Sequence, residues 1–191
     1  LLGCFNGSVM TSHFIIRDDV RQHGSGNAGL TNFYRTYGAR YALCVIICDM
    51  GKTVLACLIG GYLMHWVVGD WTLGLLIAGI GCELGHMFPV FFGFKGGKGV
   101  SSTCGVMLMT FWWQALICYV ITIALIAITK FVSLGSLALV VLFGILVTAT
   151  NWGNWLVIAW VWVIAGLCIY RHHANIGRLI HGTERKIGQK A

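Results

Sequence analysis

The residues of this chain that are best suited to chemistry form a glycine-rich stretch, GFKGGKG, at positions 93–99. Glycines let a backbone approach a ligand closely, and successive backbone N–H groups can then surround an anion. The lysines supply positive charge, and residues 100–109 are expected to begin a helix whose N-terminus favours an anion. This pattern predicts a phosphate-binding loop. Its candidate ligand-binding residues are Lys95, Gly96, Gly97, Lys98 and Gly99.

Two other interpretations of this stretch are weaker. A Walker A loop carries Ser or Thr directly after its lysine, but here Gly99 follows Lys98, so magnesium-nucleotide binding is not indicated. Lysines that snorkel to a membrane interface would explain the charges but not the glycines.

A second polar segment, residues 17–40, contains the run GSGNAG at 24–29. The run matches a GxGxxG dinucleotide fingerprint formally, but that fingerprint needs a preceding strand and a βαβ unit, and here a charged run precedes it. A backbone nest for an anion remains, with neutral hydrogen-bond donors and a bidentate arginine. A mobile polar loop is the alternative. The candidate residues are Gly24, Ser25, Gly26, Asn27, Gly29, Thr31, Asn32 and Arg35.

A third polar segment covers residues 171–191. Histidine exchanges protons near neutral pH, which makes His172 a candidate for acid–base chemistry. A basic segment that only satisfies the positive-inside rule, or that binds anionic lipid heads, is the alternative. Such a segment has no need of His172, Asn175 or Glu184.

These polar segments interrupt a strongly apolar chain. Of its 191 residues, 58% are hydrophobic and 10% are charged, and the mean hydropathy is +0.81. A soluble domain carries about 25% charged residues, so the composition indicates an integral membrane protein. Ionisable residues are costly in a membrane, and Glu83 and His86, which precede the glycine-rich stretch at a membrane edge, are therefore functional candidates.

The apolar runs predict an all-α protein with a single polytopic domain over residues 1–191. The run 41–48 is too short to span a bilayer, and Asp49 and Lys52 interrupt it. One of the last two runs is expected to be a half-helix or a pair with its neighbour. We therefore expect about seven helices, some half-spanning, with about five full crossings. The runs are 1–16, 41–48, 53–69, 71–85, 104–129, 131–150 and 155–170.

The distribution of positive charge predicts an orientation. The net charge is +7, and the positive residues, Lys190 among them, gather in the three polar segments. The positive-inside rule places these segments, and with them the candidate active site, at the cytoplasmic face. The tryptophan-bearing turns 67–71 and 148–155 carry no Lys or Arg and are expected at the opposite interface. The N-terminus is then outside and the C-terminus inside.

The eight cysteines do not indicate a disulfide framework, because they lie in or beside apolar runs and none forms a CxxC pair. Buried thiols of this kind behave as small hydrophobic residues. A metal site needs clustered ligands, and the sequence shows no such cluster. We therefore expect neither a metal nor another cofactor.

Together the three segments resemble the signature loops of the PlsY family, which are bacterial membrane glycerol-3-phosphate acyltransferases. The resemblance rests on GSGNAGLTNFYRTYG (24–38), GHMFPVFFGFKGGKGVSS (85–102) and RHHANIGRLIHGTERKIG (171–188), and it covers nearly the whole chain. It implies that acyl phosphate acylates the 1-hydroxyl of sn-glycerol 3-phosphate, giving lysophosphatidate and phosphate in phospholipid synthesis. It also implies a monomer in the bacterial inner membrane, with no cofactor and no nucleic-acid partner.

The resemblance further implies roles for individual residues. Lys98 and the glycine loops would hold phosphate groups and stabilise negative charge that develops in the reaction. The other catalytic residues would orient the two substrates, and the proton acceptor is either His172 or the substrate's own phosphate. Glu184 would be structural, while His86 and Arg178 join the substrate-binding set. The catalytic residues implied are Ser25, Arg35, Lys98, His172 and Asn175.

Three rival classes are weaker. An anion or phosphate transporter could use the basic segments as an entry vestibule, but the turns on the far side lack matching features. A non-catalytic membrane adaptor leaves the glycine-rich segments unexplained. The HxxxxD motif of other acyltransferases has a formal match from His13 to Asp18, but it stands at an expected helix end without that family's context.

Overall fold

The computed structural model describes residues 1–189, and within them it is all helical, with no strand. Lys190 lies outside the described residues. The chain divides into two compact units, one formed by Leu1–Val106 with Gly188 and Gln189, the other by Met107–Ile187. The expected single domain stays a prediction.

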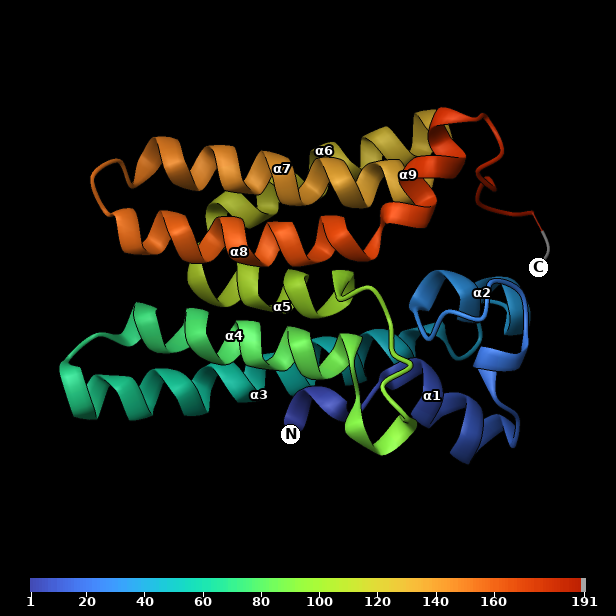
Figure 1. Cartoon of the computed structure of the whole chain (residues 1–191), viewed down its shortest axis with the longest axis horizontal. Coiled ribbons are helices and arrows are strands. Elements are labelled where there is room, and N and C mark those ends of the chain that lie inside the picture. Colours follow the sequence, from blue (N-terminus) through green and yellow to red (C-terminus); the bar gives the residue numbers. More distant parts are fainter. Residues whose placement is uncertain (190–191) are drawn as a thin grey trace. The chain divides into compact units, whose positions relative to one another are not determined.

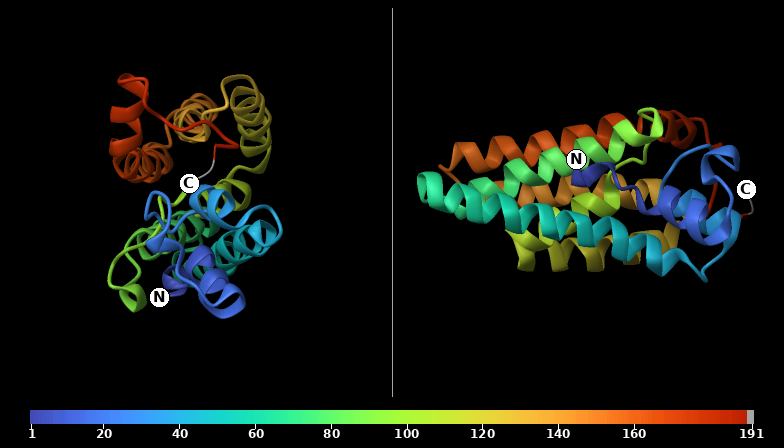
Figure 2. Two further views of the ribbon diagram at one scale, coloured as in Figure 1. Left: turned by 90° about the vertical axis from the view of Figure 1, so that its right-hand side faces the viewer. Right: turned by 90° about the horizontal axis from the view of Figure 1, so that it is seen from below.

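The first unit is built around a helical hairpin of α3 (Ala42–Val68) and α4 (Trp71–Met87), which lie side by side in Figures 1 and 2. α3 ends at Gly69, which has a φ of 76°, a left-handed conformation that glycine adopts without strain. Asp70 then caps α4, because its side chain accepts a hydrogen bond of 2.9 Å from the Leu73 N–H. The short turn makes the two helices antiparallel.

Glycines allow α3 and α4 to approach each other closely. A Cβ at Gly60 of α3 would lie 2.7 Å from the carbonyl oxygen of Gly74 on α4. Small residues at such contacts are typical of helix pairs in a bilayer, where packing rather than the hydrophobic effect drives association.

Short elements complete the first unit. A buried apolar cluster, formed by Val9, Val20, Ala28, Phe33 and Val45, packs them together beside α3. The short elements are η1 (Leu2–Cys4), α1 (Gly7–Thr11), η2 (Ser12–Ile16), η3 (Val20–Gln22), α2 (Leu30–Tyr37), η4 (Val90–Phe92) and the first part of α5 (Val100–Thr110).

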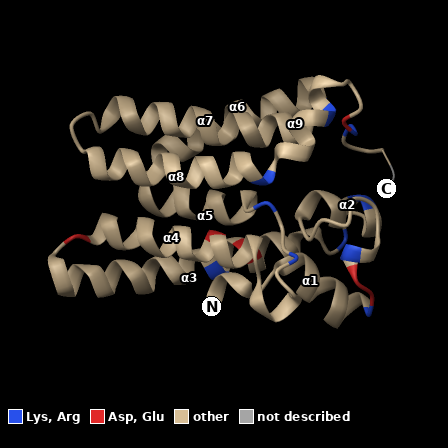
Figure 3. Cartoon of the chain, viewed as in Figure 1, with Lys and Arg blue, Asp and Glu red and all other residues tan. Residues whose placement is uncertain are grey.

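The second unit contains three long helices and one short one. Lys130 ends the first of them with a left-handed φ of 64°, and Asn154 caps the third by accepting a hydrogen bond of 3.3 Å from the Val157 N–H. Figure 3 shows no charged residue along α6 or α7, as expected for helices in lipid. The helices are α6 (Trp112–Thr129), α7 (Val132–Thr150), α8 (Trp155–Arg171) and α9 (His173–Ile180).

Within residues 1–189, four helices are long and apolar enough to cross a membrane: α3, α4, α6 and α7. α8 and α9 pass the same test together, with a bend of 61° between them, and raise the number to five. The all-α membrane class is confirmed, and five crossings agree with the expected number.

One predicted interruption is wrong. The runs 41–48 and 53–69 form the single helix α3, although Asp49 and Lys52 lie between them. These residues are three positions apart on one helix face, and their side chains form an ion pair of 2.9 Å. The two charges therefore neutralise each other and the helix continues through them.

Other boundaries also differ from the prediction. The run 104–129 is divided at Phe111, which has a non-helical ψ of 66° and separates α5 from α6. The run 1–16 forms only short helices. Both α7 and α8 are long, and the break follows α8 at His172. α2 and α9 form inside the polar segments, where one apolar helix face is enough to pack against a neighbour.

Candidate active site

The first two polar segments lie at the same end of the first unit. The first segment precedes the start of α3, the second follows the end of α4, and the helices are antiparallel. One hydrogen bond of 2.9 Å joins the two segments, because Arg21 Nη1 donates to the carbonyl of Phe92. A second, also of 2.9 Å, ties the first segment to the residue before α1, because Asn6 Nδ2 donates to the carbonyl of Ala28. The structure therefore brings together the two segments that were predicted to bind an anion.

The glycine loop, residues 93–99, folds back onto the end of α4. The Gly97 N–H donates a hydrogen bond of 3.1 Å to the carbonyl of His86. A Cβ at Gly96 would overlap this carbonyl, and a Cβ at Gly97 would overlap the imidazole of His86 and lie 2.8 Å from the carbonyl oxygen of Ala28. Glycine is needed at both positions because the backbone runs closer to its neighbours than a side chain permits.

The exit of the glycine loop is fixed by the start of α5. Gly99 has a φ of 87°, which favours glycine, and its carbonyl accepts a hydrogen bond of 2.7 Å from the Thr103 N–H. The hydroxyl of Thr103 donates a second hydrogen bond, of 3.0 Å, to the buried carboxylate of Glu83 on α4. α4 thus positions the helix N-terminus that was expected to favour an anion.

The two lysines of the loop differ in environment. Lys98 is partly buried between the packed glycines Gly97 and Gly99, whereas Lys95 is exposed at the loop surface. Lys98 is therefore the lysine whose backbone is fixed by closely packed neighbours.

Asn32 organises the first polar segment. Its Oδ1 accepts a hydrogen bond of 3.0 Å from the Ser25 N–H, and its Nδ2 donates to the carbonyls of Val20 and His23 at 3.1 and 3.0 Å. The oxygen and the nitrogen of this buried amide thus both bond to the backbone of the segment and stabilise its conformation. The structure thus gives Asn32 a scaffolding role, and its predicted contact with substrate stays a prediction.

A polar cluster within this segment escaped sequence reasoning. Asp18 accepts hydrogen bonds from His23 at 2.8 Å, from the Asp19 N–H at 2.7 Å and from the Tyr37 hydroxyl at 2.9 Å. The hydrogen bond from His23 is the largest of the effects that lower the pKa of Asp18. Burial and the Asp18 carboxylate raise the pKa of Tyr37. The carboxylate form of Asp18 therefore ties the start of the segment to α2.

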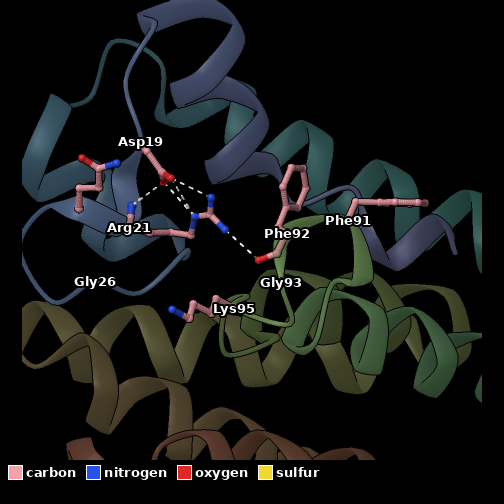
Figure 4. A pocket seen from close by; sticks show the side chains of 8 residues that line it. Asp19, Arg21, Gly26, Phe91, Phe92, Gly93 and Lys95 are labelled. Carbon is pink, nitrogen blue, oxygen red and sulfur yellow. Dashed lines mark hydrogen bonds and ion pairs between the residues drawn. The ribbon is translucent and has the colours of Figure 1, made fainter.

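A pocket of about 780 Å³ opens between the first segment and the glycine loop (Figure 4). Arg21 crosses one wall, where its guanidinium pairs with Asp19 at 2.7 Å and donates to the carbonyl of Phe92. Gly26 and Lys95 are the predicted site residues that line it; Ser25, Arg35 and Lys98 are not among the described lining residues. The lining consists of Asp19, Arg21, Gln22, Gly26, Phe91, Phe92, Gly93 and Lys95.

In the second unit, His172 lies at the bend between α8 and α9 and is 2% exposed. Its Nδ1 lies 2.8 Å from the carbonyl oxygen of Cys168. A carbonyl only accepts, so Nδ1 carries the proton and donates. In the neutral ring Nε2 is then the basic nitrogen.

Glu184 is the centre of a hydrogen-bonded cluster at the same end of the second unit. Its side chain is 4% exposed. It accepts hydrogen bonds from Asn175 Nδ2 at 2.7 Å, from Ser133 Oγ at 2.8 Å and from Arg178 Nε at 2.6 Å. Burial alone would raise the pKa of Glu184, but these hydrogen bonds outweigh it and lower the pKa below the ordinary value.

Replacing Glu184 by glutamine is expected to lower the free energy of unfolding by about 2 kcal/mol, because the charged acceptor of several hydrogen bonds is lost. A carboxylate with a lowered pKa stabilises the fold above its ordinary pKa of about 4.3, and this contribution disappears as the pH falls through the lowered value. The difference in Tm between wild type and Glu184→Gln, measured in detergent, should therefore be full at neutral pH and vanish in acid.

Arg178→Ala is the control for that measurement. The Arg178 side chain is 41% exposed, so its ion pair with Glu184 should contribute at most about 1 kcal/mol. Equal losses for the two variants, or an unchanged Tm for Glu184→Gln at neutral pH, would contradict the structural role of Glu184.

The predicted site residues thus fall into two groups. Ser25, Arg35, Lys98 and the glycines belong to the first unit, and His172 and Asn175 belong to the second. The meeting of all three segments at one substrate stays a prediction. Sequence reasoning missed the role of Asn6, for which no motif exists.

The fold and the glycine loop define a polytopic membrane protein whose candidate site combines closely packed glycines with lysine and arginine side chains. The chain belongs to the glycerol-3-phosphate acyltransferase family, whose model matches residues 1–182.

Similar proteins agree with this assignment. A glycerol-3-phosphate acyltransferase of Thermoanaerobacter pseudethanolicus is 40% identical over 190 residues, which cover 100% of this chain and 92% of the relative. One from Shouchella clausii is 40% identical over 197 residues, with 100% and 95% covered. The crystal structure of PlsY (YgiH), an integral membrane glycerol 3-phosphate acyltransferase, in its glycerol 3-phosphate form has a TM-score of 0.83 and 32% identity. The matched region covers 97% of this chain and 92% of the PlsY chain.

Proposed function

We propose that this glycerol-3-phosphate acyltransferase uses acyl phosphate as its donor and releases lysophosphatidate. The oxygen of the substrate's 1-hydroxyl attacks the acyl carbonyl carbon, the bond from that carbon to the phosphate oxygen breaks, and inorganic phosphate leaves. The observation that carries the proposal is the similarity along nearly the full chain to PlsY structures in a glycerol 3-phosphate form and in a lysophosphatidic acid form.

The geometry of the first unit supports this reaction. Both substrates carry phosphate, and the glycine loop places Lys98 beside the first polar segment, where a Cβ at Gly97 would lie 2.8 Å from the carbonyl oxygen of Ala28. Phosphate is a good leaving group, so the main task is to position two anions together against their repulsion. Preorganised cations and N–H groups perform that task. Ser25 and Arg35 are the further groups that we assign to substrate orientation.

The second unit offers one candidate for the proton acceptor. The hydrogen bond from His172 Nδ1 to Cys168 makes Nε2 the basic nitrogen, which is the arrangement a general base needs. The substrate's own phosphate is the alternative acceptor. Activity of His172→Gln near that of wild type would assign the proton to the phosphate.

The experiment that tests the donor uses purified protein in detergent or lipidic mesophase. Palmitoyl phosphate and glycerol 3-phosphate are supplied together and separately, and released phosphate and lysophosphatidate are measured. We expect release only when both substrates are present, with equal amounts of the two products. Lysophosphatidate formed from palmitoyl-CoA but not from palmitoyl phosphate would overturn the proposed donor.

We also propose that the protein is a monomer in the bacterial inner membrane with its C-terminus and site in the cytoplasm. The concentration of Lys and Arg in the three polar segments supports this orientation. Protease should remove a C-terminal tag in inside-out vesicles but not in intact spheroplasts, and light scattering in detergent should give the mass of one chain. The reverse protease pattern would refute the orientation.

A further inference from the structure

Three ionisable side chains are buried together inside the α3–α4 hairpin, where charges are costly and need a reason. Asp49, Lys52 and His86 are 1%, 8% and 2% exposed. Apolar residues would form the same helices. The ion pair between Asp49 and Lys52 only offsets the cost of burying its own two charges, so helix formation does not explain these residues.

The hydrogen bonds of Lys52 determine how the cluster is arranged. Its ammonium donates to the carbonyl of Phe5 at 2.8 Å and to Oδ1 of Asp49 at 2.9 Å. Its Nζ lies 2.9 Å from Nδ1 of His86, and this nitrogen also lies 3.3 Å from Oδ1 of Asp49. An ammonium group has three protons and no acceptor, so the third proton is donated to Nδ1.

The tautomer of His86 follows from this contact. With Nδ1 as acceptor, the neutral imidazole carries its proton on Nε2. Nε2 is the ring atom that lies against Gly97, where a Cβ would overlap it. The backbone carbonyl of His86 also accepts the Gly97 N–H at 3.1 Å. His86 therefore contacts the glycine loop with its ring and with its backbone.

The other end of the cluster is equally fixed. Oδ1 of Asp49 accepts a hydrogen bond of 2.9 Å from the Gly7 N–H in addition to that from Lys52. The carboxylate thus holds Lys52 in place, Lys52 orients the imidazole, and the imidazole supports the loop.

We propose that Asp49, Lys52 and His86 form a buried positioning relay that holds the glycine loop in its phosphate-binding conformation through the imidazole ring and the backbone carbonyl of His86. His86 and its two partners are positioning residues in this proposal, because they act through the loop backbone. The inference rests on the proposed function for its effect on catalysis, but not for its effect on the loop.

The test must separate positioning from simple stability. Lys52→Met or Asp49→Asn alone leaves a buried charge without a partner and should strongly lower Tm. The double variant Asp49→Asn/Lys52→Met removes both charges and should recover most of that Tm. It still removes the Lys52 ammonium that donates to the His86 ring. The relay therefore predicts a stable protein in which the glycine loop is less protected from amide exchange.

Two readouts are measured on each variant. Hydrogen–deuterium exchange of peptides covering residues 88–103 reports on the loop, and we expect exchange about tenfold faster in the double variant, with peptides from 173–187 unchanged. The kcat/KM for palmitoyl phosphate and glycerol 3-phosphate should fall about 10²-fold, because small misplacements of binding groups are costly. Thr53→Val removes a neighbouring buried hydroxyl that donates to the carbonyl of Asp49 and lies 3.4 Å from Sγ of Cys82, and it should change neither readout.

Variants of His86 provide the sharpest comparison. Glutamine can place an N–H donor near the position of Nε2, whereas leucine cannot, so His86→Gln should retain more loop protection than His86→Leu. A double variant with wild-type Tm, wild-type loop exchange and wild-type kcat/KM would overturn the relay. If the wild type itself released no phosphate, the proposed function would fail, and the exchange data alone would still decide the relay.

Discussion

Lys98→Ala is expected to lower kcat/KM by about 10²–10³-fold, which is the usual loss when a preorganised group that stabilises developing charge is removed. Lys98 is partly buried within the glycine loop, and the packed glycines on each side fix the backbone from which it extends. The backbone that carries this charge is therefore fixed before a substrate binds. Phosphate release from palmitoyl phosphate and glycerol 3-phosphate measures the effect.

Lys95→Ala is the matched control. Lys95 has the same charge and lies three positions away, but it is exposed and lines the open pocket of Figure 4. Solvent screens an exposed charge, so we expect a loss of less than about tenfold. Equal losses in the two variants would mean that the loop contributes only net positive charge and not a defined position.

Gly97→Ala is expected to reduce kcat/KM by about 10²-fold, because the added methyl group must displace the loop. The methyl group would overlap the imidazole of His86 and approach the carbonyl of Ala28. Neither neighbour is free to move. Lys52 holds the imidazole, and Asn6 Nδ2 donates to the carbonyl at 2.9 Å.

Gly51→Ala is the control for Gly97→Ala. A Cβ at Gly51 on α3 meets no atom within 4 Å. Alanine should be neutral for activity there and stabilise the helix by up to about 1 kcal/mol. Wild-type activity of Gly97→Ala would show that the loop tolerates a shift and that its close packing has no catalytic role.

The glycine loop could be predicted from the sequence because its residue types have few other uses. A lysine in an apolar chain is explicable by snorkelling, but clustered glycines are not, and the structure shows close approach or positive φ at Gly97 and Gly99. The neighbours that require this close approach, such as Ala28 and His86, could not be identified, because they are distant in sequence.

The helix boundaries could be predicted less well, and α3 shows why. Each charge was counted as an interruption, whereas the three-residue spacing of Asp49 and Lys52 was the available sign of an ion pair. The break at Phe111 carries no proline, glycine or charge, so no local signal marks it. Tertiary packing decides such a boundary, and single-sequence patterns do not contain it.

The role of Asn32 illustrates a further limit. An asparagine in a polar, glycine-rich segment has the chemistry to bind an anion, and it has the same chemistry to bind the backbone of its own segment. Only the positions of Ser25, Val20 and His23 around its amide reveal the second role.

The spacing of the ion pair in α3 also has a consequence for biogenesis. Asp49 and Lys52 lie one helical turn apart, so the pair can form as soon as this segment becomes helical, before residues 71–87 have been synthesised. The nascent helix carries its own counter-ion into the bilayer and enters it without net charge from this pair. The contact between Lys52 and His86 forms later, when α4 has been synthesised. Insertion of α3 therefore does not depend on His86.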